Sequence, residues 1–91
     1  MKFEELEFER TFDGKQAIVK FPNGYEVSVV RNGLSYGGKK GFYEIGVFDS
    51  LGRMRDPLGW GDTVKGWLLP SDVTEEMQLI KSLWTKKQKT N

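Results

Sequence analysis

Apolar and polar residues alternate along most of the chain with the two-residue period of half-buried β-strands. The alternating segments are residues 5–12, 15–21, 25–30, 42–49 and 63–69. Asn23 and Gly24 separate the second segment from the third, and an Asn-Gly pair between strand patterns is the strongest short-range signal for a β-hairpin. The sequence therefore predicts a hairpin over residues 15–31 in a mainly β, antiparallel fold.

The period changes in the last quarter of the chain, where apolar residues recur at steps of four, three and four. These residues are Val73, Met77, Ile80 and Trp84. They predict an amphipathic helix over residues 71–84, with Ser71 or Asp72 as its N-cap. Residues 86–91 contain no apolar anchor and are expected to fray, so residues 1–85 are expected to form a single domain.

Short strands joined by tight turns and followed by one helix are typical of a small curved sheet or barrel. Gly46 and Gly66 lie inside predicted strands, where glycine often marks a bulge or a sharp bend. We therefore expect a five-stranded, antiparallel, partly open barrel with one amphipathic α-helix at its C-terminal end.

Composition limits the classes of function. The chain has 91 residues, with neither cysteine nor histidine, so disulfides, the commonest zinc ligands and the usual base at neutral pH are missing. We expect no enzymatic activity, no metal and no cofactor. A chain of this size is only marginally stable alone, so a homo-oligomer is possible. The acidic first ten residues are unlike a signal peptide and no apolar run reaches membrane-spanning length, which indicates a cytoplasmic protein without membrane association.

Two basic loops are candidate anion contacts, although the net charge is only +1. Lys39 and Lys40 lie between glycines, but the loop leads into a predicted strand and lacks the spacing of a phosphate-binding loop, so a lysine-tipped turn is the better interpretation. Together with Tyr36 they combine charge with a ring, as single-stranded nucleic-acid surfaces do. Arg53 and Arg55 form the second basic loop, and the two loops would form one positive rim if they lay on the same edge of the sheet.

The acidic residues and Trp60 can each be interpreted in two ways. The acids Glu44, Asp49, Asp56 and Asp62 could bind Mg²⁺, but three of them occupy turn positions that favour aspartate. Trp60, between two glycines, either plugs one end of the barrel or forms an exposed contact for a protein partner. Trp67 and Trp84 are expected to pack between strand and helix.

Two resemblances add to this picture. The run "GYEVSVVRNGLSYGGKKGFYEIGVFD", followed by "VKGWLLPSDV", resembles a group of small uncharacterised proteins of marine tailed phages over residues 23–73. That resemblance implies a phage-encoded protein in the cytoplasm of an infected bacterial host, and it implies no particular activity.

The second resemblance is structural. "KQAIVKFPNGYEVSVV" is similar to the opening hairpin of Sm-like RNA-binding proteins, and Lys65 and Gly66 stand where that family carries an Arg-Gly pair. The helix here follows the strands, whereas it precedes them in that family. The resemblance implies an Sm-like or SH3-like barrel that binds RNA as an oligomer, with Lys65 among the contacts.

The sequence therefore supports two hypotheses for a non-enzymatic binding module. The first is single-stranded RNA binding by an Sm-like oligomer, with six candidate contact residues. These are Tyr36, Lys39, Lys40, Arg53, Arg55 and Lys65. The alternative is a protein-binding accessory factor that modifies a host complex, with Trp60 as the candidate contact.

Overall fold

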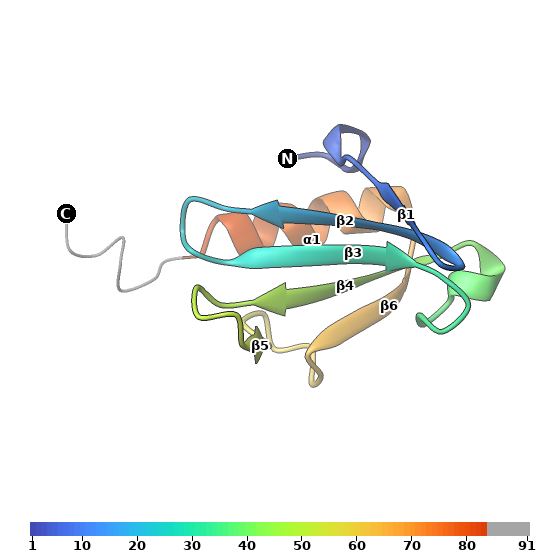
Figure 1. Ribbon diagram of the computed structural model, residues 1–91. Helices are drawn as coiled ribbons and strands as arrows, with labels where there is room; N and C mark the ends of the chain where they lie inside the picture. Colours follow the sequence, from blue (N-terminus) through green and yellow to red (C-terminus); the bar gives the residue numbers. More distant parts are fainter. Residues whose placement is uncertain (84–91) are drawn as a thin grey trace.

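The computed structural model describes residues 1–83, which form a sheet with one helix packed against it (Figure 1). The elements in chain order are η1 (Phe3–Glu5), β1 (Glu9–Thr11), β2 (Gly14–Lys20), β3 (Glu26–Arg31), η2 (Gly38–Lys40), β4 (Tyr43–Phe48), β5 (Met54–Arg55), β6 (Val64–Leu68) and α1 (Pro70–Lys81). The frayed tail predicted for residues 86–91, and Trp84 of the predicted helical face, lie outside the described residues.

The six strands form one antiparallel sheet in which β1, β2, β3 and β4 are consecutive neighbours. The outer edge of β4 is divided between two partners, because β5 pairs with Val47 and Phe48 while β6 pairs with residues 43–46. A mainly β, antiparallel fold with a C-terminal helix is thus confirmed. The five-stranded barrel is not, because the sheet is not closed: within residues 1–83, β1 pairs only with β2, and β5 and β6 each pair only with β4.

The predicted hairpin is confirmed. β2 and β3 pair from Lys15 opposite Arg31 to Lys20 opposite Glu26, and the turn contains Gly24 with a φ of 95°. That value lies in the left-handed region that glycine adopts without strain. The hairpin therefore forms the centre of the sheet, as its turn sequence indicated.

The N-terminal segment differs from the strand predicted for residues 5–12, because only residues 9–11 pair in the sheet, as β1. Before it, the backbone N–H of Lys2 donates to the Glu5 carboxylate at 2.7 Å, and the N–H of Phe3 donates to Thr74 Oγ1 on α1 at 2.8 Å. Phe3 and Phe8 pack against Tyr43 with ring centroids 4.9 and 5.7 Å away. The first residues therefore fold back over the core and lie close to the helix, instead of extending the sheet.

The core lies between the sheet and α1, which covers one face of the sheet (Figure 1). Its fully buried members include the apolar helical face predicted from the sequence, Val73, Met77 and Ile80. The helix begins at Pro70, where the fixed φ of proline suits the first turn. The N-cap is Leu69, not Ser71 or Asp72 as predicted. Asp72 lies in the first turn, where its carboxylate accepts the backbone N–H of Leu69 at 2.9 Å.

The other end of the helix is held by Asn23 from the β2–β3 turn. The Asn23 side chain is only 1% exposed, and its Nδ2 lies 2.7 Å from the carbonyl oxygen of Ile80, 3.2 Å from that of Lys81 and 3.1 Å from that of Leu83. The last carbonyl groups of a helix have no intrahelical partner, and this amide donates to the final two of α1, those of Ile80 and Lys81. The hairpin turn and the end of the helix are therefore joined by one side chain.

Candidate nucleic-acid interface

The candidate site is built where the loop of residues 32–42 crosses a bulge in β6. The register of β6 against β4 shifts by one residue between Tyr43 and Ile45, as the glycine at position 66 predicted. A Cβ atom on Gly66 would overlap the side chain of Tyr36. The next residue, Trp67, has a φ of 58° and donates its backbone N–H to the Tyr36 carbonyl oxygen at 3.1 Å. The loop therefore sits directly on the bulge.

This docking places aromatic rings at the surface. Tyr36 and Trp67 are 56% and 59% exposed, and the rings of Phe42 and Trp67 have centroids 5.6 Å apart. Gly37 is buried beneath them, and an added Cβ there would lie 3.0 Å from the Trp67 ring. A bulky residue in the left-handed region is strained, so the surroundings must hold Trp67 in this position.

Two lysines lie on the same loop. Lys39 and Lys40 belong to η2, which lies between Gly37 and Gly41, both with positive φ. Both lysines are exposed, and within residues 1–83 neither takes part in an ion pair. The loop continues into β4, as the sequence indicated. We call these five residues the aromatic-lysine cluster: Tyr36, Lys39, Lys40, Phe42 and Trp67.

The loop is preorganised by its own side chains. Asn32 Oδ1 accepts the backbone N–H groups of Leu34 and Ser35, both at 2.8 Å, and Ser35 Oγ accepts the N–H of Asn32 at 2.9 Å. The Glu44 carboxylate accepts the N–H of Tyr36 at 3.0 Å. Such local bonds reduce the ordering entropy that a ligand would otherwise have to overcome.

The second basic loop is different because both of its arginines contact one carboxylate. The Nε atoms of Arg53 and Arg55 lie 3.0 and 2.9 Å from Asp49 Oδ2. The Arg55 side chain, followed by the backbone N–H of Arg53, holds the pKa of Asp49 well below its ordinary value of 3.8. The carboxylate therefore stays ionised at neutral pH and offsets part of the charge of this loop.

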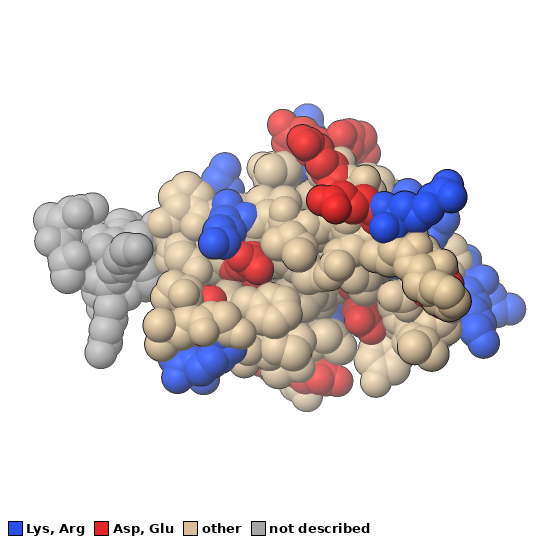
Figure 2. All heavy atoms as spheres, in the orientation of Figure 1, with Lys and Arg blue, Asp and Glu red and all other residues tan. Residues whose placement is uncertain are grey.

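The two basic loops do not form one rim. They lie at opposite ends of β4, whose six residues span roughly 17 Å at the usual rise of a strand. Figure 2 shows Lys and Arg side chains gathered toward the two ends of this face, with uncharged surface and several Asp and Glu side chains between them. The structure therefore brings Tyr36, Lys39 and Lys40 together and leaves Arg53 and Arg55 apart from them.

Lys65 and Trp60 both donate hydrogen bonds to Glu76, a residue that the sequence did not single out. Glu76 on α1 is buried, and its Oε1 accepts Lys65 Nζ at 2.9 Å and the indole N–H of Trp60 at 3.2 Å. Trp60 is partly buried against the core. Its loop is fastened by Asp56, which accepts the N–H groups of Trp60 and Gly61, and the first of these bonds is the main cause of the lowered pKa of Asp56.

The position of Trp67 differs from the one that its sequence predicted. It was expected to pack between strand and helix, whereas its ring packs on Phe42 and Gly37 and remains largely exposed. The bulge is the cause, because the extra residue re-aims the side chain that follows Gly66. The Gly66 signal was visible in the sequence, but its consequence for the next residue depends on where the bulge falls.

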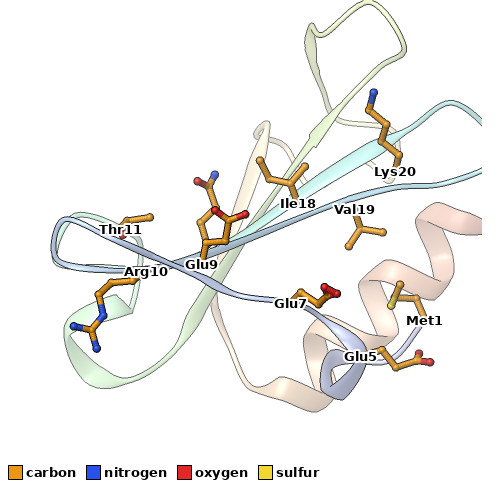
Figure 3. Close-up of a pocket in the computed structure, with 10 residues that line it drawn as sticks. Met1, Glu5, Glu7, Glu9, Arg10, Thr11, Ile18, Val19 and Lys20 are labelled. Carbon is orange, nitrogen blue, oxygen red and sulfur yellow. The ribbon is translucent and has the colours of Figure 1, made fainter.

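A groove of about 570 Å³ lies beside β2 and is lined along its N-terminal wall by Glu5, Glu7 and Glu9 (Figure 3). These carboxylates make the groove unsuitable for a polyanion.

No helix within residues 1–83 has the length and apolar character needed to cross a membrane. Comparisons with protein-family models, with curated proteins and with solved structures found no match for this chain.

Proposed function

We propose that the protein is a non-enzymatic binding module for single-stranded RNA and that the aromatic-lysine cluster is its contact surface. One observation carries the proposal: a preorganised loop presents the exposed ring of Tyr36 and two lysines that have no carboxylate partner among the described residues, and it docks on the exposed ring of Trp67 in β6. Single-stranded nucleic acids bind surfaces on which bases stack against aromatic side chains while basic residues contact the backbone.

An Sm-like oligomer would strengthen this surface. Among residues 1–83, the strands β1 and β6 each pair on one side only, so their other edges would be available for contacts between subunits. A ring of copies would repeat the cluster around an axis, and several weak contacts on one strand of RNA would combine into a higher avidity. A phage-encoded protein in the cytoplasm of an infected bacterium would meet RNA there, in keeping with the resemblance to marine phage proteins.

The decisive experiment is fluorescence anisotropy with a labelled oligouridylate at low and moderate salt. The wild-type affinity should fall as salt rises, and Tyr36→Ala and Trp67→Ala should each weaken binding by about 1–3 kcal/mol through lost stacking. Leu51→Ala is the control, because Leu51 is also a largely exposed apolar residue, 74% exposed, but lies in the other basic loop. Light scattering on the same samples tests for a ring.

The proposal fails if the wild type does not bind at low salt. It also fails if the two ring variants bind as tightly as Leu51→Ala. A folded state for each variant is verified by its thermal unfolding, so that lost binding is not confused with lost structure.

A protein-binding accessory factor is the second candidate, and the uncovered face of the sheet favours it. Ile18 and Met54 are 57% and 45% exposed on this side, and Figure 2 shows uncharged surface in the centre of the face, interrupted by a few Asp and Glu side chains. Trp60 is a poor contact because its indole N–H is already bonded to Glu76. Copurification of one defined host protein with the wild type, and its loss with Ile18→Lys, would support this candidate; equal recovery with both forms would count against it.

A further inference from the structure

Three basic residues stand side by side on the three neighbouring strands β1, β2 and β3. The register pairs Arg10 with Lys15, and Lys15 in turn with Arg31. We call these three residues the cation row. Like charges directly opposite one another in an antiparallel pair repel and destabilise the sheet. A row of three therefore needs either counter-charges nearby or another reason for its presence.

Counter-charges are not supplied by the described part of the chain, where none of the three residues takes part in an ion pair. Two of them lie over aromatic rings instead. Lys15 Nζ is 4.7 Å from the centroid of the Phe8 ring, and Arg31 Cζ is 5.5 Å from that of Tyr43. A ring face orients a cation and attracts it weakly, but it does not neutralise the charge. The two cations are therefore held in place with their positive charge uncompensated.

The cation row also lines a pocket of about 480 Å³ at this end of the sheet. Thr11, next to Arg10, lines the same pocket, and its hydroxyl is the one buried side-chain polar atom without a hydrogen-bond partner within residues 1–83. An unpaired buried hydroxyl is costly. Thr11 alternates with Arg10 along β1, however, so its side chain lies on the side of Glu9 and does not contribute to the cation row.

Two acidic residues line this pocket as well, Glu9 and Asp13. Asp13 Oδ2 already accepts the backbone N–H of Gly33 at 3.1 Å. Glu9 alternates with Arg10 along β1, and Figure 3 shows their side chains pointing in opposite directions. The carboxylates therefore leave the cation row free to receive an anion.

We propose that the cation row is a binding site for a phosphate group. Guanidinium groups donate paired hydrogen bonds that match phosphate oxygens, and an ammonium adds a compact charge, so Arg10, Lys15 and Arg31 provide complementary donors. This phosphate site uses no residue of the aromatic-lysine cluster. It nevertheless lies at the same end of the sheet, since Arg31 precedes the loop of residues 32–42 and Tyr43 follows it. A phosphate in the row could belong to a nucleic-acid backbone or to a small phosphate ester.

The test is thermal unfolding in pyrophosphate or inorganic phosphate against sodium chloride of the same ionic strength. Phosphate should raise the Tm of the wild type, because a ligand that binds only the folded state stabilises it. Lys15→Gln should weaken phosphate binding about tenfold, as expected for one lost charge-assisted hydrogen bond. Lys20→Gln is the matched control, because it removes the same charge from the far end of the same strand.

Arg10→Gln is a second variant in case Lys15→Gln does not fold. Because the Arg10 side chain is exposed, its replacement should leave the fold intact. It should also weaken phosphate binding about tenfold. Two results would overturn the proposal: no rise in the wild-type Tm at matched ionic strength, or an undiminished rise in both Lys15→Gln and Arg10→Gln.

A competition experiment identifies the source of the phosphate. If pyrophosphate displaces labelled oligouridylate, the row contacts the backbone of the same strand that the rings bind. If pyrophosphate binds without displacing it, the row serves a small phosphate ester. Because the Tm assay contains no RNA, loss of RNA binding with retained phosphate binding would refute the proposed function and leave this site standing.

Discussion

The two basic loops at the ends of β4 look alike in the sequence and differ in the structure. Each contains a glycine turn and two basic residues, Lys39 and Lys40 in one and Arg53 and Arg55 in the other. Asp49 binds both arginines, whereas the lysines have no such partner among the described residues. The number of basic residues in a loop is therefore a poor guide to its capacity for anions, which depends on the carboxylates within reach.

The largest difference should come from the backbone of the two loops. A Cβ on Gly38 would overlap the carbonyl oxygen of Asn32, while a Cβ on Gly52 would meet no atom within 4 Å. Gly38→Ala should lower the free energy of unfolding by about 1–3 kcal/mol and abolish RNA binding, because it displaces the first loop. Gly52→Ala should cost about 1 kcal/mol from its positive φ and keep RNA binding. Denaturant unfolding and anisotropy measure both; equal RNA affinities for the two variants would contradict the comparison.

Removing the basic charges should give a smaller difference between the two loops, seen in the salt dependence of RNA affinity. For single strands, the slope of log affinity against log salt is about −0.7 per phosphate neutralised. Replacing Lys39 and Lys40 together by glutamine should thus reduce the slope by about 1.4 if each contacts a phosphate. The double change of Arg53 and Arg55 to glutamine should leave the slope nearly unchanged. A larger change for the arginine pair would mean that the second loop contacts the RNA.

The smallest effect should follow from releasing the arginines. Asp49→Asn removes the carboxylate between Arg53 and Arg55, so we expect slightly tighter binding of RNA at low salt. Because the pKa of Asp49 is lowered in the folded state, its stabilising contribution is present above the ordinary value of 3.8 and is lost as pH falls below it. The wild-type Tm should therefore fall more than that of Asp49→Asn between pH 5 and about pH 2. Parallel falls in Tm would show that this ion pair does not stabilise the fold.

Local patterns predicted the elements well, because they depend on neighbours in the chain. The Asn23-Gly24 turn, the strand at β4 and the apolar helical face are all specified by period and turn chemistry. The closure of the sheet was not predictable in this way. It depends on which strand reaches the outer edge of β4, and two short strands share that edge here.

The candidate site was only half predictable for the same reason. Tyr36, Lys39 and Lys40 are close in sequence, so their loop could be recognised as a unit. Trp67 joins them from a strand 31 positions after Tyr36, through a bulge that no local pattern positions. The ion pairs of Arg53, Arg55 and Lys65 were likewise invisible, since the last of these needs a buried glutamate on the helix.

The turn that holds the helix end also has a chemical consequence. In an Asn-Gly pair, the backbone nitrogen of the glycine can attack the side-chain carbonyl carbon of the asparagine and expel ammonia. Water then opens the resulting succinimide ring to aspartate or isoaspartate. Here the attacking nitrogen, that of Gly24, donates to the carbonyl oxygen of Phe21 at 3.0 Å, and the Asn23 amide is occupied by the last carbonyl groups of α1. Deamidation therefore requires the helix to leave the turn, and the aspartate it creates would face those same carbonyl oxygens and oppose redocking. The fraction of deamidated residue at position 23 should therefore increase with the time that this helix end spends undocked from the turn.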